Sequence, residues 1–393
     1  MESTLYRHAA IADGRSPDLR VGVSMLVIDG RIAWFGDVAD EPAHPQGTRM
    51  VDAGGATIVP GMVDAHSHVS LPGGSHWISR IDDTTDALLR VAEENGERLV
   101  RAGVRWARDV GSPTREVDGR NRALTLHVKD HWHGRRDRPY IRASGTWLGK
   151  TGTLPNAGFL DEAKDADEMV AIGERHLDQG ADHIKLYMDG PDPGTAIWTP
   201  SEIARLVGAA AARGATVTAH ATQPAGTRAA VFGGVRSIEH GDHIEADVAA
   251  EMAARDTFLV TTHSVFMSWL SFGSTTDLER FAAPDARPRI EERLESARDS
   301  VRIAQRAGVA IAGGSDFGGG SLRAGHLTWE VEALVEAGLE PWEALAAVTW
   351  RGGELLGEPS AGVLEIGGPA DGFLVHGDPL RDPSALWRVV EVL

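Results

Sequence analysis

Residues 58–68 read IVPGMVDAHSH, an apolar run that ends in His66 and His68, and this stretch decides the fold. Seven further short apolar runs follow it, and stretches with helical periodicity separate them. Short apolar runs that alternate with helical patterns predict parallel strands joined by crossover helices. We therefore expect eight strands, at residues 58–65, 104–109, 140–144, 182–188, 215–220, 236–240, 257–262 and 309–315.

The helices between the expected strands carry boundary signals. A helical pattern that starts at Asp86 ends at Gly103, and glycine is favoured just past a helix C-terminus. Thr199, Pro200 and Glu202 form a capping-box pattern at the start of another helix. Eight strands, each followed by a helix, predict an α/β fold in which residues 57–360 form a (β/α)8 TIM barrel. Its chemistry would lie at the C-terminal ends of the strands.

The two ends of the chain have a different pattern, with short alternating runs broken by Gly, Asp and Pro. In residues 25–37 (MLVIDGRIAWFGD), two apolar runs flank Asp29-Gly30, which predicts a β-hairpin. Because chain termini often lie close together, we expect residues 1–56 and 361–393 to form one small β-sandwich domain.

The composition is that of a globular protein with an acidic surface. The 393 residues are 42% hydrophobic and 24% charged, and the formal net charge is −18, which disfavours nucleic acid and anionic membranes as partners. The absence of cysteine excludes disulfides, thiolate metal sites, iron–sulfur clusters and cysteine nucleophiles. No apolar run approaches the length of a membrane span, and the first residues lack signal-peptide features. We therefore expect a cytoplasmic protein.

Polar residues of a few kinds fall at the ends of the expected strands. Histidine and carboxylate side chains bind zinc and similar ions, and residues two apart on an extended strand point the same way. The pattern therefore predicts a metal site at the mouth of the barrel. Its candidate ligands are His66, His68, Lys185, His220, His240 and Asp316.

Lys185 needs a separate explanation, because an ammonium group cannot bind a cation. The chain has only four lysines, and this one lies between Ile184 and Leu186 in an apolar strand. Burial lowers the pKa of a lysine, and the neutral amine is nucleophilic. It could capture carbon dioxide as a carbamate (N6-carboxylysine), whose two oxygens could bridge two metal ions.

Each of these residues has an ordinary structural explanation when it is taken alone. Six side chains of suitable types at the ends of the expected strands together favour a metal site. The other histidine cluster, at His127, His131 and His133, lies among charged residues and reads as an exposed helix end. His243 and His326 could support the site from behind. His263 follows the seventh strand, where it could touch substrate or be a buried hydrogen-bonded ring.

The motifs together resemble those of the amidohydrolase superfamily. They are residues 58–68, VTAHA around His220, SIEHG around His240, GGSDF around Asp316, and the C-terminal pattern of residues 343–380. Residues 182–190 (DHIKLYMDG) resemble the carboxylated-lysine strand of the binuclear branch, which includes prolidase-like and imidazolonepropionase-like hydrolases.

The resemblance implies a (β/α)8 barrel with two divalent ions. His66, His68 and Asp316 would bind one ion, His220 and His240 the other, and carboxylated Lys185 would bridge them. Zinc is the first candidate metal, and manganese, cobalt and iron are also chemically suitable. A homo-oligomer is implied by the resemblance alone.

The sequence departs from the peptidase-like members where substrate should bind. They usually carry a glycine- and histidine-rich segment after the third strand, whereas residues 144–158 have no histidine here. Trp147, Lys150 and Tyr187 could instead line an aromatic pocket with one positive charge. Such a pocket would favour a flat or aromatic small molecule with a carboxylate.

We expect hydrolysis of a C–N bond in an amide, carbamate, urea, N-acyl amino acid or dipeptide-like substrate. Two metals would share a water and lower its pKa from 15.7 toward about 7. The hydroxide would attack the carbonyl, and Asp316 would carry its proton to the leaving nitrogen as general acid/base. His263 could steady the oxyanion.

Three alternatives remain open. Esters or lactones could be hydrolysed at the same binuclear site. A mononuclear deaminase of an aminated heterocycle could use the same barrel, but deaminases that resemble this family carry a glutamate where this chain has Gln223, and they lack the strand-four lysine. A non-catalytic scaffold is disfavoured because the ligand set is complete.

Overall fold

Eight parallel strands form the centre of the computed structural model, which describes residues 2–153 and 160–393. In chain order they are β6 (Met62–Ser67), β7 (Val104–Asp109), β10 (Tyr140–Ala143), β13 (His183–Tyr187), β14 (Thr216–Ala221), β15 (Ser237–His240), β16 (Phe258–Thr261) and β17 (Ile311–Gly313). All eight predicted strands are therefore present. The first starts later than expected, because the residues before Gly61 pair with a different sheet.

The parallel strands belong to two sheets rather than one continuous ring. One has the order β10-β7-β6, and the other runs from β13 to β17 in sequence order. The second sheet also holds two short strands that the sequence pattern did not reveal, β11 (Trp147–Lys150) and β12 (Leu160–Ala163). Isolated parallel bridges join the sheets at both junctions, between Ser67 and Phe317 and between Ser144 and His183.

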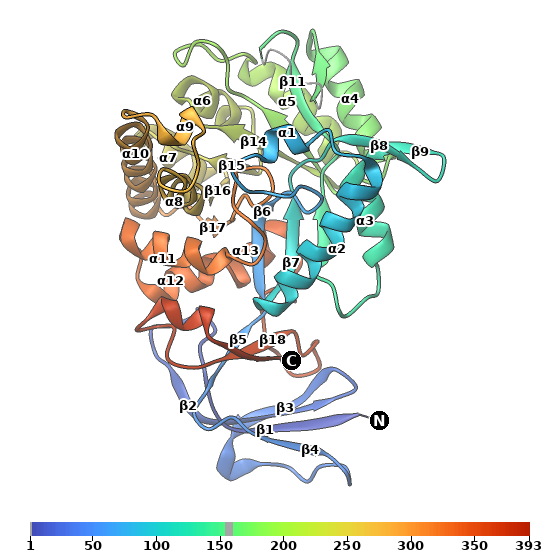
Figure 1. Ribbon diagram of the computed structural model, residues 1–393, viewed down its shortest axis with the longest axis vertical. Coiled ribbons are helices and arrows are strands. Elements are labelled where there is room, and N and C mark those ends of the chain that lie inside the picture. The colour runs from blue at the N-terminus through green and yellow to red at the C-terminus, as the bar shows by residue number, and fades with distance from the viewer. Residues whose placement is uncertain (1, 154–159) are drawn as a thin grey trace.

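Helices surround these strands (Figure 1). They are α2 (Thr85–Arg101), α3 (Leu124–Trp132), α4 (Ala166–Asp178), α5 (Pro200–Ala211), α6 (Pro224–Phe232), α7 (Ala246–Ala254), α8 (His263–Phe272), α10 (Ala286–Ala307), α11 (Leu327–Ala337), α12 (Pro341–Ala347) and α13 (Trp350–Leu356). Short pieces are α1 (Trp77–Arg80), α9 (Glu279–Ala282), η1 (Val38–Asp40), η2 (Pro383–Trp387) and the hairpin of β8 (Thr114–Val117) and β9 (Arg120–Ala123).

The predicted helix boundaries are confirmed where the sequence signals were strongest. The side chain of Thr199 accepts a hydrogen bond from the backbone of Glu202, whose own side chain bonds back to the Thr199 amide, so the capping box at α5 is complete. Helix α2 ends just before Gly103, whose φ of +80° is the left-handed conformation that glycine favours past a helix end.

The chain termini share one seven-stranded β-sheet. Its strands are β1 (Ser3–Ile11), β2 (Arg20–Ile28), β3 (Arg31–Asp37), β4 (Arg49–Asp52), β5 (Thr57–Pro60), β18 (Gly372–Val375) and β19 (Val389–Val392). The predicted hairpin is confirmed: β2 and β3 are antiparallel, and Asp29 and Gly30 both have positive φ at the turn. In Figure 1 this sheet lies at the bottom, with N-terminal strands in blue beside C-terminal ones in red.

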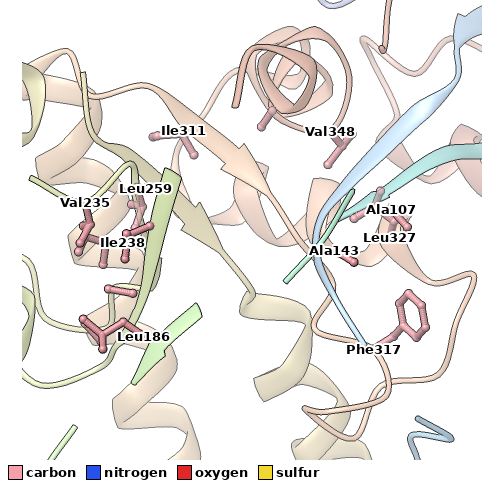
Figure 2. Packing of buried hydrophobic residues seen from close by; sticks show 14 of the residues in the cluster. Ala107, Ala143, Leu186, Val235, Ile238, Leu259, Ile311, Phe317, Leu327 and Val348 are labelled. Atoms are coloured by element: carbon pink, nitrogen blue, oxygen red, sulfur yellow. The ribbon is translucent and has the colours of Figure 1, made fainter. Parts of the chain in front are cut away.

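The hydrophobic core lies between the parallel strands and the helices that cover them. Ile238 and Leu259, from neighbouring strands, are fully buried, and Val235, two residues before β15, lies with them. Figure 2 shows this group, with Ile311 and Val348 farther along the same core. No helix in the described residues is both long and apolar enough to cross a membrane. The rigid core fixes the strand ends, where the polar residues lie.

Candidate metal centre

Two histidines and one aspartate meet at the C-terminal ends of β6 and β17. Nε2 of His68 lies 3.1 Å from Oδ1 of Asp316, and Nε2 of His66 lies 3.5 Å from the same oxygen. All three residues are buried, and one potential ligand atom from each lies within 4.8 Å of the others. The amide of Asp316 also donates to the carbonyl of His66 (2.7 Å), which fixes the two strand ends together. These donors suit a divalent metal ion.

The outer nitrogen of each histidine is held by the protein. Nδ1 of His66 lies 2.7 Å from Oε2 of Glu239, and Nδ1 of His68 lies 2.7 Å from the carbonyl oxygen of Gly111. Such partners fix the tautomer and leave Nε2 unprotonated for a metal. The three side chains therefore have the arrangement of metal ligands and not that of a chance polar cluster.

Glu239 is the centre of a buried hydrogen-bond network that the sequence analysis missed. Its carboxylate accepts hydrogen bonds from Arg108 (3.0 Å) and Ser237 (2.7 Å), and also from Thr218. Burial opposes ionisation of Glu239, but the charges of Arg108 and Lys185 outweigh it and hold the pKa of this carboxyl well below its usual range. The carboxylate therefore stays charged behind His66.

His220 and His240 end the neighbouring strands β14 and β15. Their ring centroids are 4.6 Å apart, and the His240 ring is 4.7 Å from that of His66. Nδ1 of His240 is hydrogen-bonded to Oγ1 of Thr262 (2.8 Å). Nε2 of His220 lies 3.1 Å from Oδ2 of Asp189. Each ring thus keeps one nitrogen for another partner.

Lys185 lies on β13 and lines the same cavity as these histidines. It is 1% exposed, and Nζ has no hydrogen-bond partner among the described residues. Burial lowers the pKa of Lys185 to about 8, so its neutral amine is more accessible than that of an exposed lysine. A buried amine without a hydrogen-bond partner is unusual in a folded protein.

The electrostatics of the site favour neutral imidazoles at His66 and His240 but not at His68. Burial and the nearby Lys185 hold the pKa of His66 well below its usual value. Burial and the neighbouring rings of His220 and His66 do the same for the pKa of His240. Burial opposes protonation of His68, but its hydrogen bond with Asp316 outweighs that effect and raises its pKa. Neutral imidazole is the form that binds metal.

A cavity of about 460 Å³ opens over these residues. All six predicted metal ligands line it. Its other walls are mainly aromatic and apolar, with a few polar side chains. They include Trp77, Ile78, Trp147, Leu160, Tyr187, Thr222, Asp242, Thr262, Phe266, Trp269 and Arg293.

The predicted substrate residues fall into two groups. Trp147 and Tyr187 line the cavity, where Tyr187 stacks on His220 with centroids 4.1 Å apart. Lys150 does not line it in the described structure: its Nζ donates to the carbonyl of Ile197 (2.7 Å). His263 begins α8, is 1% exposed and is also absent from the described lining, so we assign it no contact with substrate.

Arg293 and Asp242 line the cavity although the sequence analysis did not select them. Asp242 lies two residues after His240, and this position was the available signal. Arg293 lies on α10, far in sequence from any strand end, and nothing in its local pattern marks it.

Comparisons with known proteins show the family and relatives with the same fold. The profile of the Amidohydrolase family matches residues 57–393. An uncharacterised protein of Mycobacterium tuberculosis (strain H37Rv) is 30% identical over 382 residues, which cover 94% of this chain and 90% of that protein. Ochratoxinase of Aspergillus niger is 26% identical over 416 residues, covering 96% and 82%. The crystal structure of a Xaa-Pro dipeptidase has a TM-score of 0.84 at 22% identity, covering 100% and 98%.

Proposed function

Because the chain belongs to the amidohydrolase family, we propose that it uses a two-metal centre to hydrolyse an amide, carbamate, urea or N-acyl amino acid. The enzyme is a hydrolase of carbon–nitrogen bonds with a metal site at His66, His68 and Asp316. The observation that supports the metal most strongly is the convergence of three buried ligand atoms whose histidines are held from behind.

A second ion would be held by His220 and His240, with Lys185 between the two sites. The unpartnered, buried Nζ of Lys185 supports this role. In the proposed modification, the neutral amine attacks the carbon of carbon dioxide, one proton leaves the nitrogen, and a carbamate anion results. The carbamate supplies the charge and the two oxygens that a bridge requires. Zinc is the first candidate for both ions.

Bound divalent ions would polarise the substrate carbonyl and lower the pKa of water toward about 7. Asp316 would take the proton of the attacking water, and the position of its carboxylate beside Nε2 of both His66 and His68 supports this role. It then delivers that proton to the leaving nitrogen, which departs as an amine. Glu239 and Thr262 keep the histidine rings in orientation during this transfer. The aromatic side chains of Trp147 and Tyr187 would contact the substrate.

The conformation of Gln223 favours hydrolysis over deamination. This residue occupies the position where related deaminases carry a glutamate that shuttles protons. Its side chain accepts from the amide of Gly190 (3.0 Å) and donates to the carbonyl of the same residue (2.9 Å). The side chain of Gln223 is therefore hydrogen-bonded to the backbone of Gly190, and Gln223 is not among the described residues that line the cavity. Ester or lactone hydrolysis remains the alternative reaction at this site.

We also propose that the two parallel sheets act as one (β/α)8 barrel over residues 57–360. The bridges at both sheet junctions support a ring of eight strands. Residues 1–56 and 361–393 would then form the separate β-sandwich domain. Assembly as a homo-oligomer and a cytoplasmic location stay predictions.

Metal analysis combined with a substrate screen tests the proposal. The protein is purified from cells supplied with zinc, and its metal content is measured. It is then assayed on N-acyl amino acids, dipeptides, aryl carbamates and lactones. We expect close to two ions per chain and release of an amine from an amide or carbamate. Ammonia release from aminated heterocycles, with no cleavage of amides or carbamates, would contradict it.

A further inference from the structure

One cation of the cavity is not among the metal ligands. Lys150, which the sequence pattern predicted as the positive charge of this cavity, instead contacts the carbonyl of Ile197 and the ring of Trp198. Among the described residues that line the cavity, the cations are Lys185 and Arg293. Lys185 is assigned to the metals. Arg293 is therefore the cation available to a substrate.

The guanidinium of Arg293 is held in one place by its surroundings. Its Nη2 donates to Oδ2 of Asp242 at 2.8 Å, and the side chain of Asp242 is 2% exposed. The guanidinium carbon also lies 5.2 Å from the ring centroid of Phe266 and 5.6 Å from that of Trp269. A charge fixed by a buried carboxylate and two aromatic faces loses little freedom when it binds a ligand.

Most of the hydrogen-bonding capacity of this guanidinium is unused. An arginine side chain carries five N–H donors. Within residues 2–153 and 160–393, the bond to Asp242 is its one hydrogen bond. Its side chain is 44% exposed. The remaining donors can therefore receive an anion, and the planar fork of arginine matches a carboxylate in geometry.

A different wall of the cavity is apolar. Trp77, Trp147 and Leu160 pack together with Leu71 and Ile81 in one hydrophobic cluster. Trp147 lies on β11, next to the ring of His68 at 5.3 Å. In the strand order, β13, β14 and β15 separate β11 from β16, the strand that precedes α8 and α10. The metal ligands thus lie between an apolar wall and a wall that carries Arg293.

We propose that Arg293 binds a carboxylate of the substrate, and that the preferred substrates are amides with a flat apolar group at one end and a carboxylate at the other. This inference rests on the proposed amide hydrolysis and specifies its substrate class. Arg293 is the residue that determines specificity for the charged end. Asp242 is a positioning residue that holds the guanidinium.

The test compares naphthoyl-phenylalanine with the matching compound in which a carboxamide replaces the carboxylate. Both are assayed on the metal-loaded wild type and on R293Q, R293K and R289Q. Arg289 lies one turn earlier on α10, is 60% exposed and pairs with Asp285, so its variant controls for loss of an arginine from this helix. Calorimetric binding of both compounds, with and without added metal, gives a readout that needs no turnover.

We expect the wild type to bind the acid about 10- to 100-fold more tightly than the carboxamide, as for hydrogen bonds to charged groups. R293Q should raise KM for the acid to the value for the carboxamide, so that the variant no longer distinguishes the two compounds. R293K should retain part of the preference, and R289Q all of it. A circular dichroism spectrum and a metal content equal to those of the wild type show that R293Q is folded and loaded.

Two results would overturn the inference: a wild type without preference for the acid, or an R293Q variant that keeps it. Hydrolysis of both compounds at equal rates would leave the proposed function standing without this specificity. Conversely, Arg293-dependent binding of the acid with no hydrolysis of either compound would support the carboxylate site and contradict amide hydrolysis. Failure of both compounds to bind would also reject the inference.

Discussion

At the level of single residues, Asp316 has two roles, as a candidate metal ligand and as the proposed proton carrier. It has a positive φ of +49°, and its carboxylate lies beside Gly320, where a Cβ would come within 2.4 Å of Oδ2. The backbone turn and the close glycine together place the carboxylate against the two histidines. A larger residue at position 320 would displace it.

Replacing Asp316 with Asn should lower kcat by about 10²- to 10⁴-fold, because the amide cannot accept the proton of the attacking water. KM should change less than kcat, because the proposed role of Asp316 is proton transfer rather than substrate binding. Steady-state kinetics and metal content are measured together, so that loss of an ion is recognised. A variant that keeps its metal and turns over near the wild-type rate would contradict the proton-transfer role.

Replacing Lys185 with Met should reduce the metal content from two ions per chain toward one, because the bridging carbamate cannot form. The methionine fills a similar volume in the apolar strand. Lys150→Met is the matched control, since the Lys150 amine contacts a backbone carbonyl and a tryptophan face rather than the site. Metal analysis by mass spectrometry decides the matter. Equal metal content in the two variants would contradict a role of Lys185 in metal binding.

The convergence of His66, His68 and Asp316 could be predicted because their types recur at strand ends, where the fold brings them together. Glu239 and Arg293 could not be predicted in this way. The role of Glu239 depends on Arg108 and Thr218, which lie on other strands and become its neighbours only in the folded sheet. Lys150 was misplaced because a strand pattern does not reveal which way a side chain near its end will turn.

At the level of elements, Glu93 links α2 to the end of α3. Its carboxylate accepts a hydrogen bond from Nε1 of Trp132 (2.6 Å) and another from Arg138 (2.8 Å). Partial burial opposes ionisation of Glu93, but these hydrogen bonds and the charge of Arg138 outweigh it and lower its pKa. The carboxylate form is therefore the one that stabilises the fold.

Glu93→Gln should lower the melting temperature at pH 7 and have a smaller effect in acid. A carboxyl whose pKa is depressed by folding stabilises the protein above its unfolded pKa of about 4.3. That stabilisation is lost as the pH falls through the folded pKa. The difference between wild type and variant should therefore shrink below about pH 4. Glu94→Gln, at an exposed neighbour, is the control, and a pH-independent difference would contradict the assignment.

Most element types could be predicted from hydrophobic periodicity, but one strand boundary and two short strands could not. The run at residues 58–65 is continuous in sequence, yet it divides at Gly61 because its two halves pair with different sheets. Strands β11 and β12 each have four residues, and a glycine interrupts β11. Their patterns are too short to separate from a loop.

At the level of the whole molecule, a buried ion pair joins the terminal sheet to the parallel strands. Nε of Arg105, on β7, lies 3.2 Å from Oδ1 of Asp371, just before β18, and the two side chains are 3% and 8% exposed. Arg105 also donates to the carbonyl of Arg136 (2.9 Å). Removing one partner would leave a buried charge without compensation.

Asp371→Ala should therefore reduce the free energy of unfolding by about 3–5 kcal/mol. The exposed pair of Arg20 and Asp37 in the same terminal sheet provides the contrast, and Asp37→Ala should cost about 0–1 kcal/mol. Urea unfolding followed by circular dichroism measures both. Similar values for the two variants would mean that the buried pair does not hold the parts together.

The sequence could predict the parallel sheets and the shared terminal sheet, but not whether the eight strands close into one ring. Alternating strands and helices indicated parallel sheets, and the similar pattern at both termini indicated that they meet. Whether eight strands close into one hydrogen-bonded ring depends on the backbone at two junctions, near Ser67 and Ser144. No sequence pattern records that geometry.

Gly61 is the single residue between β5 and β6. Its amide donates to the carbonyl of Asp371 (2.8 Å), and a Cβ there would lie 2.4 Å from Cγ of Arg105. Strand β6, which leads to His66 and His68, is thus connected to the terminal sheet through one residue. A force on that sheet, from a fused protein or from attachment to a surface, would therefore shift the metal ligands only a few residues away. We expect immobilisation through the N-terminus to lower the activity for this reason.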